Sequence, residues 1–371
     1  PAPGPHLKQA FEAALADLTP YTHTHGDYPA GLPSLRQALA DRYTARGVPT
    51  MPEQIMVTTG AMGAASALCH HLAPRGERIA VEHPSYANIL QLMRESGARL
   101  VPVAMAAEHR GWDLTAWHQT LRAAAPRLAY VIPDFHNPTG ALANEEQRRD
   151  LVAAARAAGT LLIADETMVD LVLDPDTAAD MPRPVAAFDP AGSAVITLGS
   201  ASKAIWAGIR IGWVRAAPDI VRRLVAARAY ADLGSPVLEQ LALTHLLTTD
   251  AWHEAVADRR DIARTNRDSL VAALRTTLPD WEFTVPTGGL TLWTRTGGLS
   301  GSRIAEAGER LGVRVPSGPR FGIDGAFEGY VRLPFTVSGP LATEAVNRLA
   351  AAARIVAGTP QNASAPGSLV A

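Results

Sequence analysis

Residues 199–213 read GSASKAIWAGIRIGW, and they follow an apolar run, Ala194–Leu198, that predicts a buried strand. Four residues of this stretch carry reactive or charged groups: Ser200, Ser202, Lys203 and Arg210. Serine hydroxyls and a guanidinium suit a phosphate group, and a lysine amine suits a Schiff base. A serine nucleophile with a lysine base would also fit, but no Gly-x-Ser-x-Gly turn accompanies the pair.

The rarity of lysine makes Lys203 informative. Lys8 and Lys203 are the only lysines among the 34 basic residues, so arginine carries nearly all of the positive charge. Arginine does not release its proton to act as an amine nucleophile, whereas lysine does. Composition alone leaves an ordinary surface lysine equally open, and the surrounding motif favours the reactive amine.

Two further predicted strands end in turns that suit a ligand. After Ile55–Val57 the sequence TTGAMG opens an alanine-rich helix, whose first N–H groups can face a phosphate, although small residues there also serve packing. After Val131–Ile132 the sequence PDFHNPTG places the Asn137 amide at a strand end, although Asn-Pro-Thr-Gly also makes a plain tight turn. Ligands of open α/β sheets bind beyond such strand ends.

Asp165 directly follows a fourth apolar run, Leu161–Ala164, and precedes Glu166. An acid in this position resembles the magnesium-binding acid of a nucleotide hydrolase. That function needs a Gly-x-x-x-x-Gly-Lys-Ser/Thr loop upstream, and the sequence has none. Asp165 can instead hold a protonated heterocyclic nitrogen. No cysteine or acidic residue flanks the histidines at ligand spacing, so no metal site is predicted.

Apolar runs alternate with stretches whose apolar residues repeat with the period of an α-helix. This pattern predicts βαβ units and a mostly parallel sheet. The clearest runs are Arg78–Glu82, Leu128–Pro133, Leu161–Asp165 and Ala194–Leu198. After Asp219 long helical stretches dominate, and strands return at Trp281–Val285 and Leu290–Thr294 before a last helix near Leu341–Ala357. We therefore expect an α/β protein with a large domain at 30–235, a smaller α+β domain from 1–29 and 236–357, and a disordered tail at 358–371.

The composition excludes several classes of protein. Hydrophobic residues make up 47% of the 371-residue chain, enough for a substantial core. The net charge of −2 argues against binding of nucleic acid by the chain as a whole. A single cysteine, Cys69, excludes a disulfide framework. No run is apolar enough to span a bilayer and no signal peptide begins the sequence, so a cytoplasmic protein is expected.

The phosphate turn, Asn-Pro-Thr-Gly, the strand-end Asp165, Ser-x-Ser-Lys and Gly-Ile-Arg-Ile-Gly occur in an order that describes a pyridoxal-phosphate site. From about His25 to Leu349 the chain resembles the fold-type I pyridoxal-phosphate aminotransferases of class I and II. Within them it is most similar to the aminotransferase-like domain of MocR-type (GntR-family) regulators. The resemblance implies a mostly parallel large domain with a smaller α+β domain.

The resemblance also implies a role for each motif residue. Lys203 would form the Schiff base and move the α-proton, Asp165 would pair with the pyridine nitrogen, and Asn137 would bond the phenolic oxygen. Tyr86 would stack on the ring, and Arg332 would bind the substrate carboxylate. The phosphate would be held by Gly60, Ala61, Met62, Ser200, Ser202 and Arg210.

Two positions depart from the family pattern. Met168 stands where the family usually has a tyrosine that bonds the phenolic oxygen. Without this tyrosine hydroxyl, the pKa of the Schiff base should rise. An aromatic residue near Gly31 normally reaches the partner subunit's site. Tyr28 is expected to take this substrate-side role, although its spacing to Gly31 is short and His25 competes for it.

The resemblance implies a homodimeric pyridoxal 5'-phosphate enzyme that acts on a small amino acid or amine and a 2-oxo acid. Two alternatives stay open. The chain is then either the ligand-sensing domain of a MocR-type regulator, whose winged helix does not occur in this sequence, or a β- or γ-replacement enzyme with the same cofactor. The amino donor and acceptor are not predicted, because loops and the partner subunit build the specificity pocket.

Overall fold

The computed structural model describes residues 4–109, 111–228 and 230–358. The predicted tail at 358–371 therefore lies outside the described residues, except for Gly358. The strands of the described residues are β1 (Ile55–Thr58), β2 (Arg78–His83), β3 (Arg99–Ala104), β4 (Leu128–Val131), β5 (Leu161–Asp165), β6 (Val195–Ser200), β7 (Gly212–Arg215), β8 (Glu282–Phe283), β9 (Thr291–Arg295) and β10 (Tyr330–Pro334).

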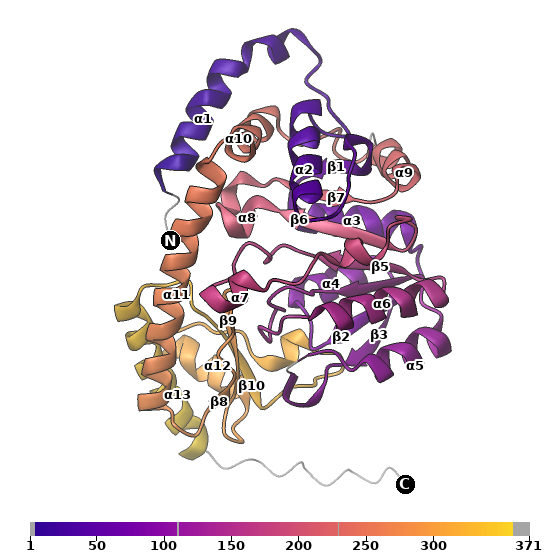
Figure 1. Ribbon diagram of the computed structural model, residues 1–371. Coiled ribbons are helices and arrows are strands. Elements are labelled where there is room, and N and C mark those ends of the chain that lie inside the picture. Colours follow the sequence, from indigo (N-terminus) through magenta and orange to yellow (C-terminus); the bar gives the residue numbers. More distant parts are fainter. Residues whose placement is uncertain (1–3, 110, 229, 359–371) are drawn as a thin grey trace.

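The large sheet has seven strands in the order β1-β7-β6-β5-β4-β2-β3 (Figure 1). The pairs from β6 to β3 are parallel, and β7 runs antiparallel to both β6 and β1. Residues of β4 and β6 are all buried, as expected for strands covered on both faces. The predicted α/β fold with a mostly parallel sheet is confirmed.

Helices connect and cover these strands. They are α1 (Pro5–Asp17), α2 (Pro33–Ala45), α3 (Gly60–Leu72), α4 (Ala87–Glu95), α5 (Leu114–Ala124), α6 (Glu145–Ala157), α7 (Pro175–Ala179), α8 (Ala201–Ala204), α9 (Pro218–Arg228), α10 (Val237–Thr248), α11 (Ala251–Thr277), α12 (Gly301–Arg310) and α13 (Gly339–Gly358). Two separate apolar clusters lie on the sheet, one containing Val57 and Val131 and the other Met56 and Ile132, because neighbouring strand residues face opposite sides.

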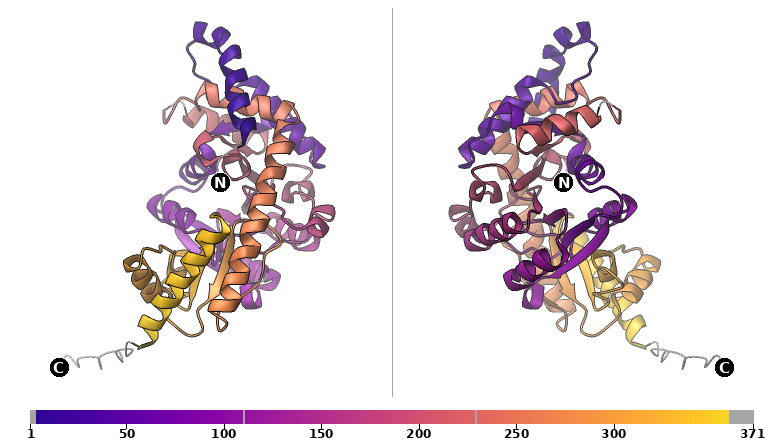
Figure 2. Two further views of the ribbon diagram at one scale, coloured as in Figure 1. Left: turned by 90° about the vertical axis from the view of Figure 1, so that its left-hand side faces the viewer. Right: turned by 90° about the vertical axis from the view of Figure 1, so that its right-hand side faces the viewer.

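A second, antiparallel sheet of order β10-β9-β8 forms the small domain with α12, α13 and part of α11. The long helix α11 runs from the large domain into the small one, and α13 lies beside it (Figure 2). Met168 and Leu171 of the large domain also belong to this small-domain core. The two domains therefore meet just beyond the end of β5, where the motif residues lie.

The N-terminal helix α1 packs against α10 at the far end of the large domain (Figure 1). Leu7, Ala10 and Ala14 of α1 share a core with Leu243 of α10 and with the sheet. The predicted domain boundaries at residues 30 and 236 stay a prediction, although α1 and α10 share an apolar cluster with the large sheet.

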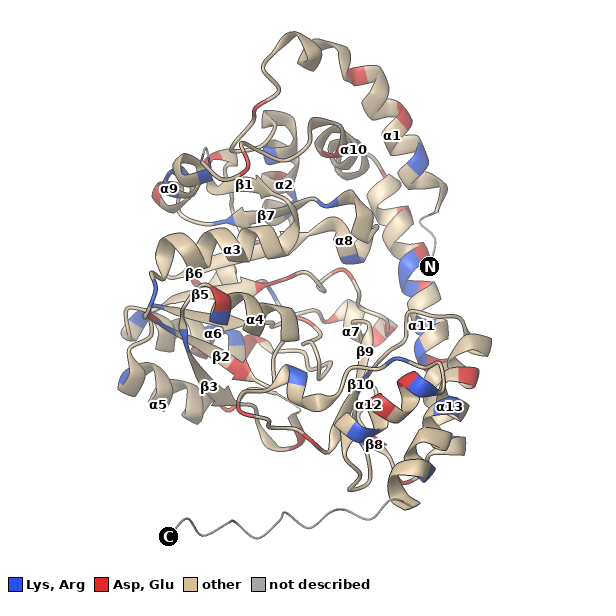
Figure 3. Ribbon diagram, turned by 180° about the vertical axis from the view of Figure 1, so that it is seen from behind, with Lys and Arg blue, Asp and Glu red and all other residues tan. Residues whose placement is uncertain are grey.

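Charged residues of both signs are interspersed over the two domains (Figure 3), in keeping with the net charge of −2. Among the described residues, no helix has the length and apolar character needed to cross a bilayer.

Candidate active site

A cavity of about 130 Å³ lies beyond the carboxyl ends of β4, β5 and β6. Most residues predicted to hold the cofactor line it, although they come from segments far apart in the sequence. Its lining includes Ala61, Met62, Tyr86, Asn137, Asp165, Ser200, Ser202, Lys203 and Arg210. The parallel strands bring these side chains together because their carboxyl ends share one edge of the sheet.

Asp165 lines this cavity and is 7% exposed. Its Oδ1 accepts a hydrogen bond from the Thr167 backbone N–H at 2.9 Å, and its Oδ2 accepts one from the Tyr130 hydroxyl at 2.5 Å. Burial raises the pKa of the Asp165 carboxyl, and the Tyr130 and Thr167 hydrogen bonds oppose that rise. The two hydrogen bonds thus orient the Asp165 carboxylate but offset only part of the cost of burying its negative charge.

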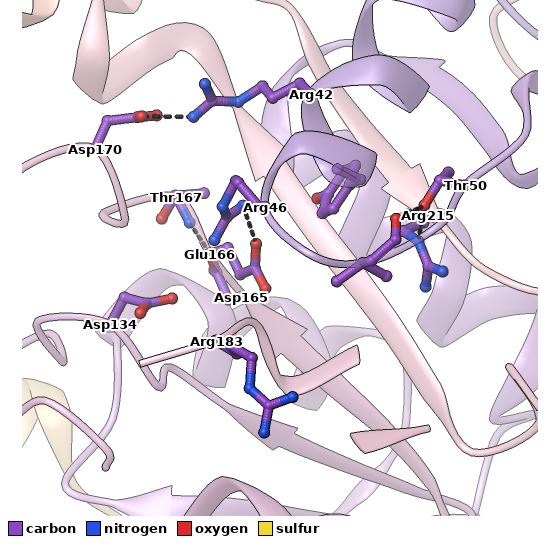
Figure 4. Close-up of polar contacts among 12 residues, drawn as sticks. Arg42, Arg46, Thr50, Asp134, Asp165, Glu166, Thr167, Asp170, Arg183 and Arg215 are labelled. Atoms are coloured by element: carbon purple, nitrogen blue, oxygen red, sulfur yellow. Dashed lines mark hydrogen bonds and ion pairs between the residues drawn. The ribbon is translucent and has the colours of Figure 1, made fainter. Parts of the chain in front are cut away.

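The next residue, Glu166, has a different partner. Its Oε2 lies 2.8 Å from the Arg46 guanidinium at the end of α2, so this acid pairs within the scaffold (Figure 4). Successive residues of a strand point to opposite faces, which separates the two carboxylates. Figure 4 also shows Thr167 bonded to Asp165. The two adjacent acids therefore serve different purposes.

Tyr130 was not predicted as a site residue. It lies inside β4 and is 1% exposed, so the sequence shows only an aromatic residue in a buried strand. Its contact with Asp165 crosses between adjacent strands, where Tyr130 pairs with Ile163 in register. The available signal was a polar hydroxyl in an otherwise apolar run, because a buried tyrosine usually finds a partner.

One buried ion pair and one buried histidine–glutamate contact hold the loop that carries Asn137. Arg148 of α6 is fully buried and reaches Asp134 at 2.7 Å, while its Nε donates to the Ala143 carbonyl at 2.9 Å. On the other side, His136 Nε2 lies 3.0 Å from Glu82 Oε2, and both side chains are fully buried. These contacts fix residues 133–143 from two directions and so orient the Asn137 amide toward the cavity.

The turn after β1 and the turn after β6 form a cup suited to a phosphate. Gly60 has a φ of +75°, and a Cβ there would lie 2.8 Å from the Arg210 guanidinium. A Cβ on Gly212 would lie 2.7 Å from the Ala61 backbone nitrogen. Ser202 Oγ is buried without a hydrogen-bond partner among the described residues. Close backbone approach, an unused hydroxyl and a guanidinium fit a phosphate here.

Lys203 lies in the short helix α8 and lines this cavity and a second one. Burial lowers the pKa of its amine, the positive charge of Arg332 lowers it further, and the negative charge of Asp165 opposes both. A lowered pKa leaves more of the amine unprotonated and nucleophilic. The environment of Lys203 thus suits covalent chemistry.

The second cavity, of about 380 Å³, adjoins the first and extends to the small domain. Tyr86, Asn137, Met168 and Lys203 line both cavities. At its other side Arg332 of β10 lies over the Phe321 ring at 5.1 Å and donates to Asn137 Oδ1 at 3.3 Å. Burial lowers the pKa of Arg332, and its Nε is buried without a partner among the described residues. Arg332 is therefore available to an anion.

Tyr28 and Gly60 are the predicted residues that do not line either cavity. Gly60 still belongs to the turn that forms the phosphate cup, where a Cβ would lie 2.8 Å from the Arg210 guanidinium. Tyr28 is more remote: its hydroxyl lies 3.3 Å from Thr24 Oγ1, and its ring meets Tyr21 edge-on at 6.0 Å. Within one chain the structure does not bring Tyr28 to the site. Met168 does lie there, and it offers no hydrogen-bond donor.

The model of the family "Aminotransferase class I and II" matches residues 5–349. The chain belongs to this family. A 2-aminoadipate transaminase of Thermus thermophilus is 31% identical over 312 residues, which cover 83% of this chain and 77% of that protein. A helix-turn-helix-type transcriptional regulator of Bacillus subtilis, YisV, is 28% identical over 84% of this chain but only 63% of its own length.

A crystal structure of LysN, the α-aminoadipate aminotransferase of Thermus thermophilus, superimposes with a TM-score of 0.86. It is 28% identical, and the match covers 96% of this chain and 91% of that one. That structure holds N-(5'-phosphopyridoxyl)-L-leucine. The fold-type I architecture, the pyridoxal 5'-phosphate cofactor and the aminotransferase activity predicted from the sequence are confirmed.

Proposed function

We propose that this aminotransferase works through Lys203 and Asp165 in a cytoplasmic homodimer, and that it exchanges an amino group between an amino acid and a 2-oxo acid. The observation that carries the residue roles is the convergence of Lys203, Asp165 and Asn137 on one cavity with the phosphate cup. Pyridoxal phosphate supplies an electron sink that stabilises negative charge at the substrate's α-carbon. The other steps belong to residues of this chain.

Each group has a task that its surroundings support. The phosphate cup around Ser202 and Arg210 binds and anchors the cofactor. The Asp165 carboxylate holds a proton at the ring nitrogen, which in turn neutralises a buried charge. The Lys203 amine would hold the cofactor and would move the proton of the substrate's α-carbon, as its lowered pKa allows. Arg332 binds the substrate α-carboxylate.

A homodimer is proposed because one chain leaves a predicted phosphate residue exposed and a predicted substrate residue away from the cavities. Arg210 is exposed, and Tyr28 lies away from both cavities. Tyr230, Leu233 and Trp206 are also exposed large hydrophobic residues, with Tyr230 96% exposed. Burial of such side chains against a second copy would be favourable. In that dimer Tyr28 would complete the partner subunit's site.

The main experiment compares Lys203→Ala with Lys8→Ala. Both chains are purified with pyridoxal phosphate and assayed for 2-oxo acid formation from a panel of amino acids. Lys203→Ala should lose turnover by at least about 10²-fold, the lower range for a proton-transfer group, whereas Lys8→Ala should match the parent. Turnover by Lys203→Ala equal to the parent would overturn the assignment.

The similarity to a regulator supports a second candidate, a sensor domain that binds an amino compound with the same residues. A sensor would bind the amino acid and change its absorption spectrum without multiple turnovers. Release of ammonia or of a β- or γ-substituent, measured in the same reactions, would instead indicate a replacement enzyme. Repeated transfer of the amino group from an amino acid to a 2-oxo acid supports the aminotransferase.

A further inference from the structure

The substrate cavity contains more positive charge than a single carboxylate needs. Its lining comprises Tyr86, Ala87, Asn88, Asn137, Met168, Lys203, Leu290, Thr291, Pro316, Arg320, Phe321, Arg332, Pro334 and Thr336. Among these described residues there is no aspartate or glutamate. Besides Lys203, which the cofactor engages, two charged groups remain, Arg320 and Arg332. A cavity with this lining suits a ligand with two negative charges.

Arg320 is free to bind a ligand. Its side chain is exposed at the cavity and forms no ion pair or hydrogen bond with any described residue. Arg314, six positions earlier, shows the usual alternative, because its guanidinium lies 2.7 Å from Glu309 Oε1. An arginine without a carboxylate partner on the wall of a cavity keeps its planar set of donors for an incoming anion.

The backbone of Arg320 is held in a fixed relation to Arg332. Arg320 belongs to a short 3₁₀ turn, Gly318–Phe321, and the Arg332 backbone N–H donates to the Pro316 carbonyl at 3.0 Å just before that turn. From the large domain, the Ser85 N–H donates to the Phe321 carbonyl at 2.9 Å. The two arginines are thus mounted on one braced unit, which suits recognition of two charged groups in one molecule.

The positive charges of Arg320 and Arg332 also repel each other. Burial lowers the pKa of Arg332 most, and the positive charge of Arg320 lowers it further. The mutual repulsion implied by that effect is relieved when a dianion lies between them, whereas a monocarboxylate compensates only one of the charges. Two cations placed in this way therefore favour dicarboxylic ligands over monocarboxylic ones.

We propose that Arg320 binds the side-chain carboxylate of an acidic amino acid while Arg332 binds the α-carboxylate. Arg320 is then a specificity residue that selects dicarboxylic amino acids and the matching dicarboxylic 2-oxo acids. This inference rests on the proposed function, since it takes the second cavity as the substrate site. It predicts poor use of uncharged amino acids of the same length.

The test compares Arg320→Met, Arg320→Lys and the control Arg314→Met in the holoenzyme. Values of kcat/KM are measured for aspartate, glutamate and 2-aminoadipate, and for norleucine as an uncharged comparison. Arg320→Met should lower kcat/KM for the best acidic substrate about 10- to 100-fold, the range for a hydrogen bond to a charged group, and leave norleucine within about twofold. Arg320→Lys should recover part of the loss, and Arg314→Met should match the parent.

Binding provides a readout that does not depend on turnover. Dissociation constants of glutarate and butyrate are measured by calorimetry for the same holoenzymes, and Arg320→Met should weaken glutarate alone. Equal loss for glutarate and butyrate, or no loss for either, would overturn the role of Arg320, as would a parent enzyme that prefers norleucine. A parent that transaminates no amino acid would contradict the proposed function, while glutarate binding would still decide the role of Arg320.

Discussion

Asp165 shows how a single residue can work against the stability of its own fold. The carboxylate is buried with two hydrogen bonds and no cation bonded to it among the described residues. Its raised pKa means that the folded chain without cofactor holds the proton more tightly than the unfolded chain does. In the proposed site, a cofactor that presents a protonated nitrogen would supply the missing charge, which would couple cofactor binding to folding.

Replacing Asp165 by asparagine should therefore stabilise the cofactor-free protein while lowering turnover by about 10² or more. The proton that Asp165 holds in the folded chain stabilises the fold fully below the ordinary carboxyl pKa of about 4. This stabilisation is lost as the pH rises through the pKa of Asp165 in the folded chain. The melting temperature of Asp165→Asn minus that of the parent should accordingly grow as the pH rises above about 4. A difference that shrinks with rising pH would contradict this account.

The Tyr130 hydroxyl is a positioning group for Asp165, because it donates to the carboxylate at 2.5 Å. Tyr130→Phe removes one hydrogen bond to a charged group and should lower turnover about 10- to 100-fold without changing the packing volume much. The pKa of Asp165 should rise further, since this hydrogen bond opposes the effect of burial. The measurement is turnover together with the pH dependence of the bound cofactor's absorption.

Tyr43→Phe is the matched control, since Tyr43 is as buried as Tyr130 and also hydrogen-bonded, to Trp213 at 3.1 Å. It should affect stability but leave the cofactor spectrum unchanged. If both variants changed the spectrum alike, Tyr130 would act through packing and not through Asp165.

At the scale of elements, the strands that could be predicted are those with continuous apolar runs. The ranges expected near β2, β4, β5 and β6 match the structure to within a few residues, because these strands are covered on both faces. β3 was missed because it is an edge strand with mostly partly exposed residues and a proline, Pro102. β7 was missed because Gly212–Arg215 directly follows the phosphate motif and has only four residues.

The site residues show the same distinction between signals that are local in the sequence and contacts that only the fold creates. Lys203, Asp165, Asn137 and the phosphate turn are local motifs at strand ends, so their order in the sequence predicted a shared cavity that the structure contains. Tyr130 depends on a contact across two strands, and its polar partner cannot be read from its own neighbours. The role proposed for Tyr28 requires a second chain, which a single sequence does not describe.

The loop that carries Asn137 depends on the buried Arg148–Asp134 pair. Arg148→Met leaves the Asp134 carboxylate buried without its cation, which should lower the free energy of unfolding by about 3–5 kcal/mol. The double variant Arg148→Met/Asp134→Leu should recover part of that loss, because it removes the uncompensated charge as well. Denaturant titration of both variants measures this. A double variant less stable than Arg148→Met would contradict it.

The whole molecule is proposed to act as a dimer in which Tyr28 serves the partner subunit's site. Tyr28→Ala and Lys203→Ala should each be impaired as pure proteins. When the two are mixed and allowed to exchange subunits, a hybrid should contain one complete site, built from Lys203 of one chain and Tyr28 of the other. The mixture should therefore regain activity that neither protein shows alone. No recovery, despite exchange confirmed by mass spectrometry, would place Tyr28 outside the site.

The central claim is that Lys203 holds the cofactor, and borohydride reduction followed by peptide mass mapping tests it most directly. The holoenzyme is reduced, digested and searched for the phosphopyridoxyl mass on the two lysine-containing peptides. Because Lys8 and Lys203 are the only lysines in the sequence, the result is binary. The account predicts the label on the Lys203 peptide at close to one per chain and none on Lys8. Label on Lys8, or an unlabelled Lys203 in a protein that retains bound cofactor, would contradict it.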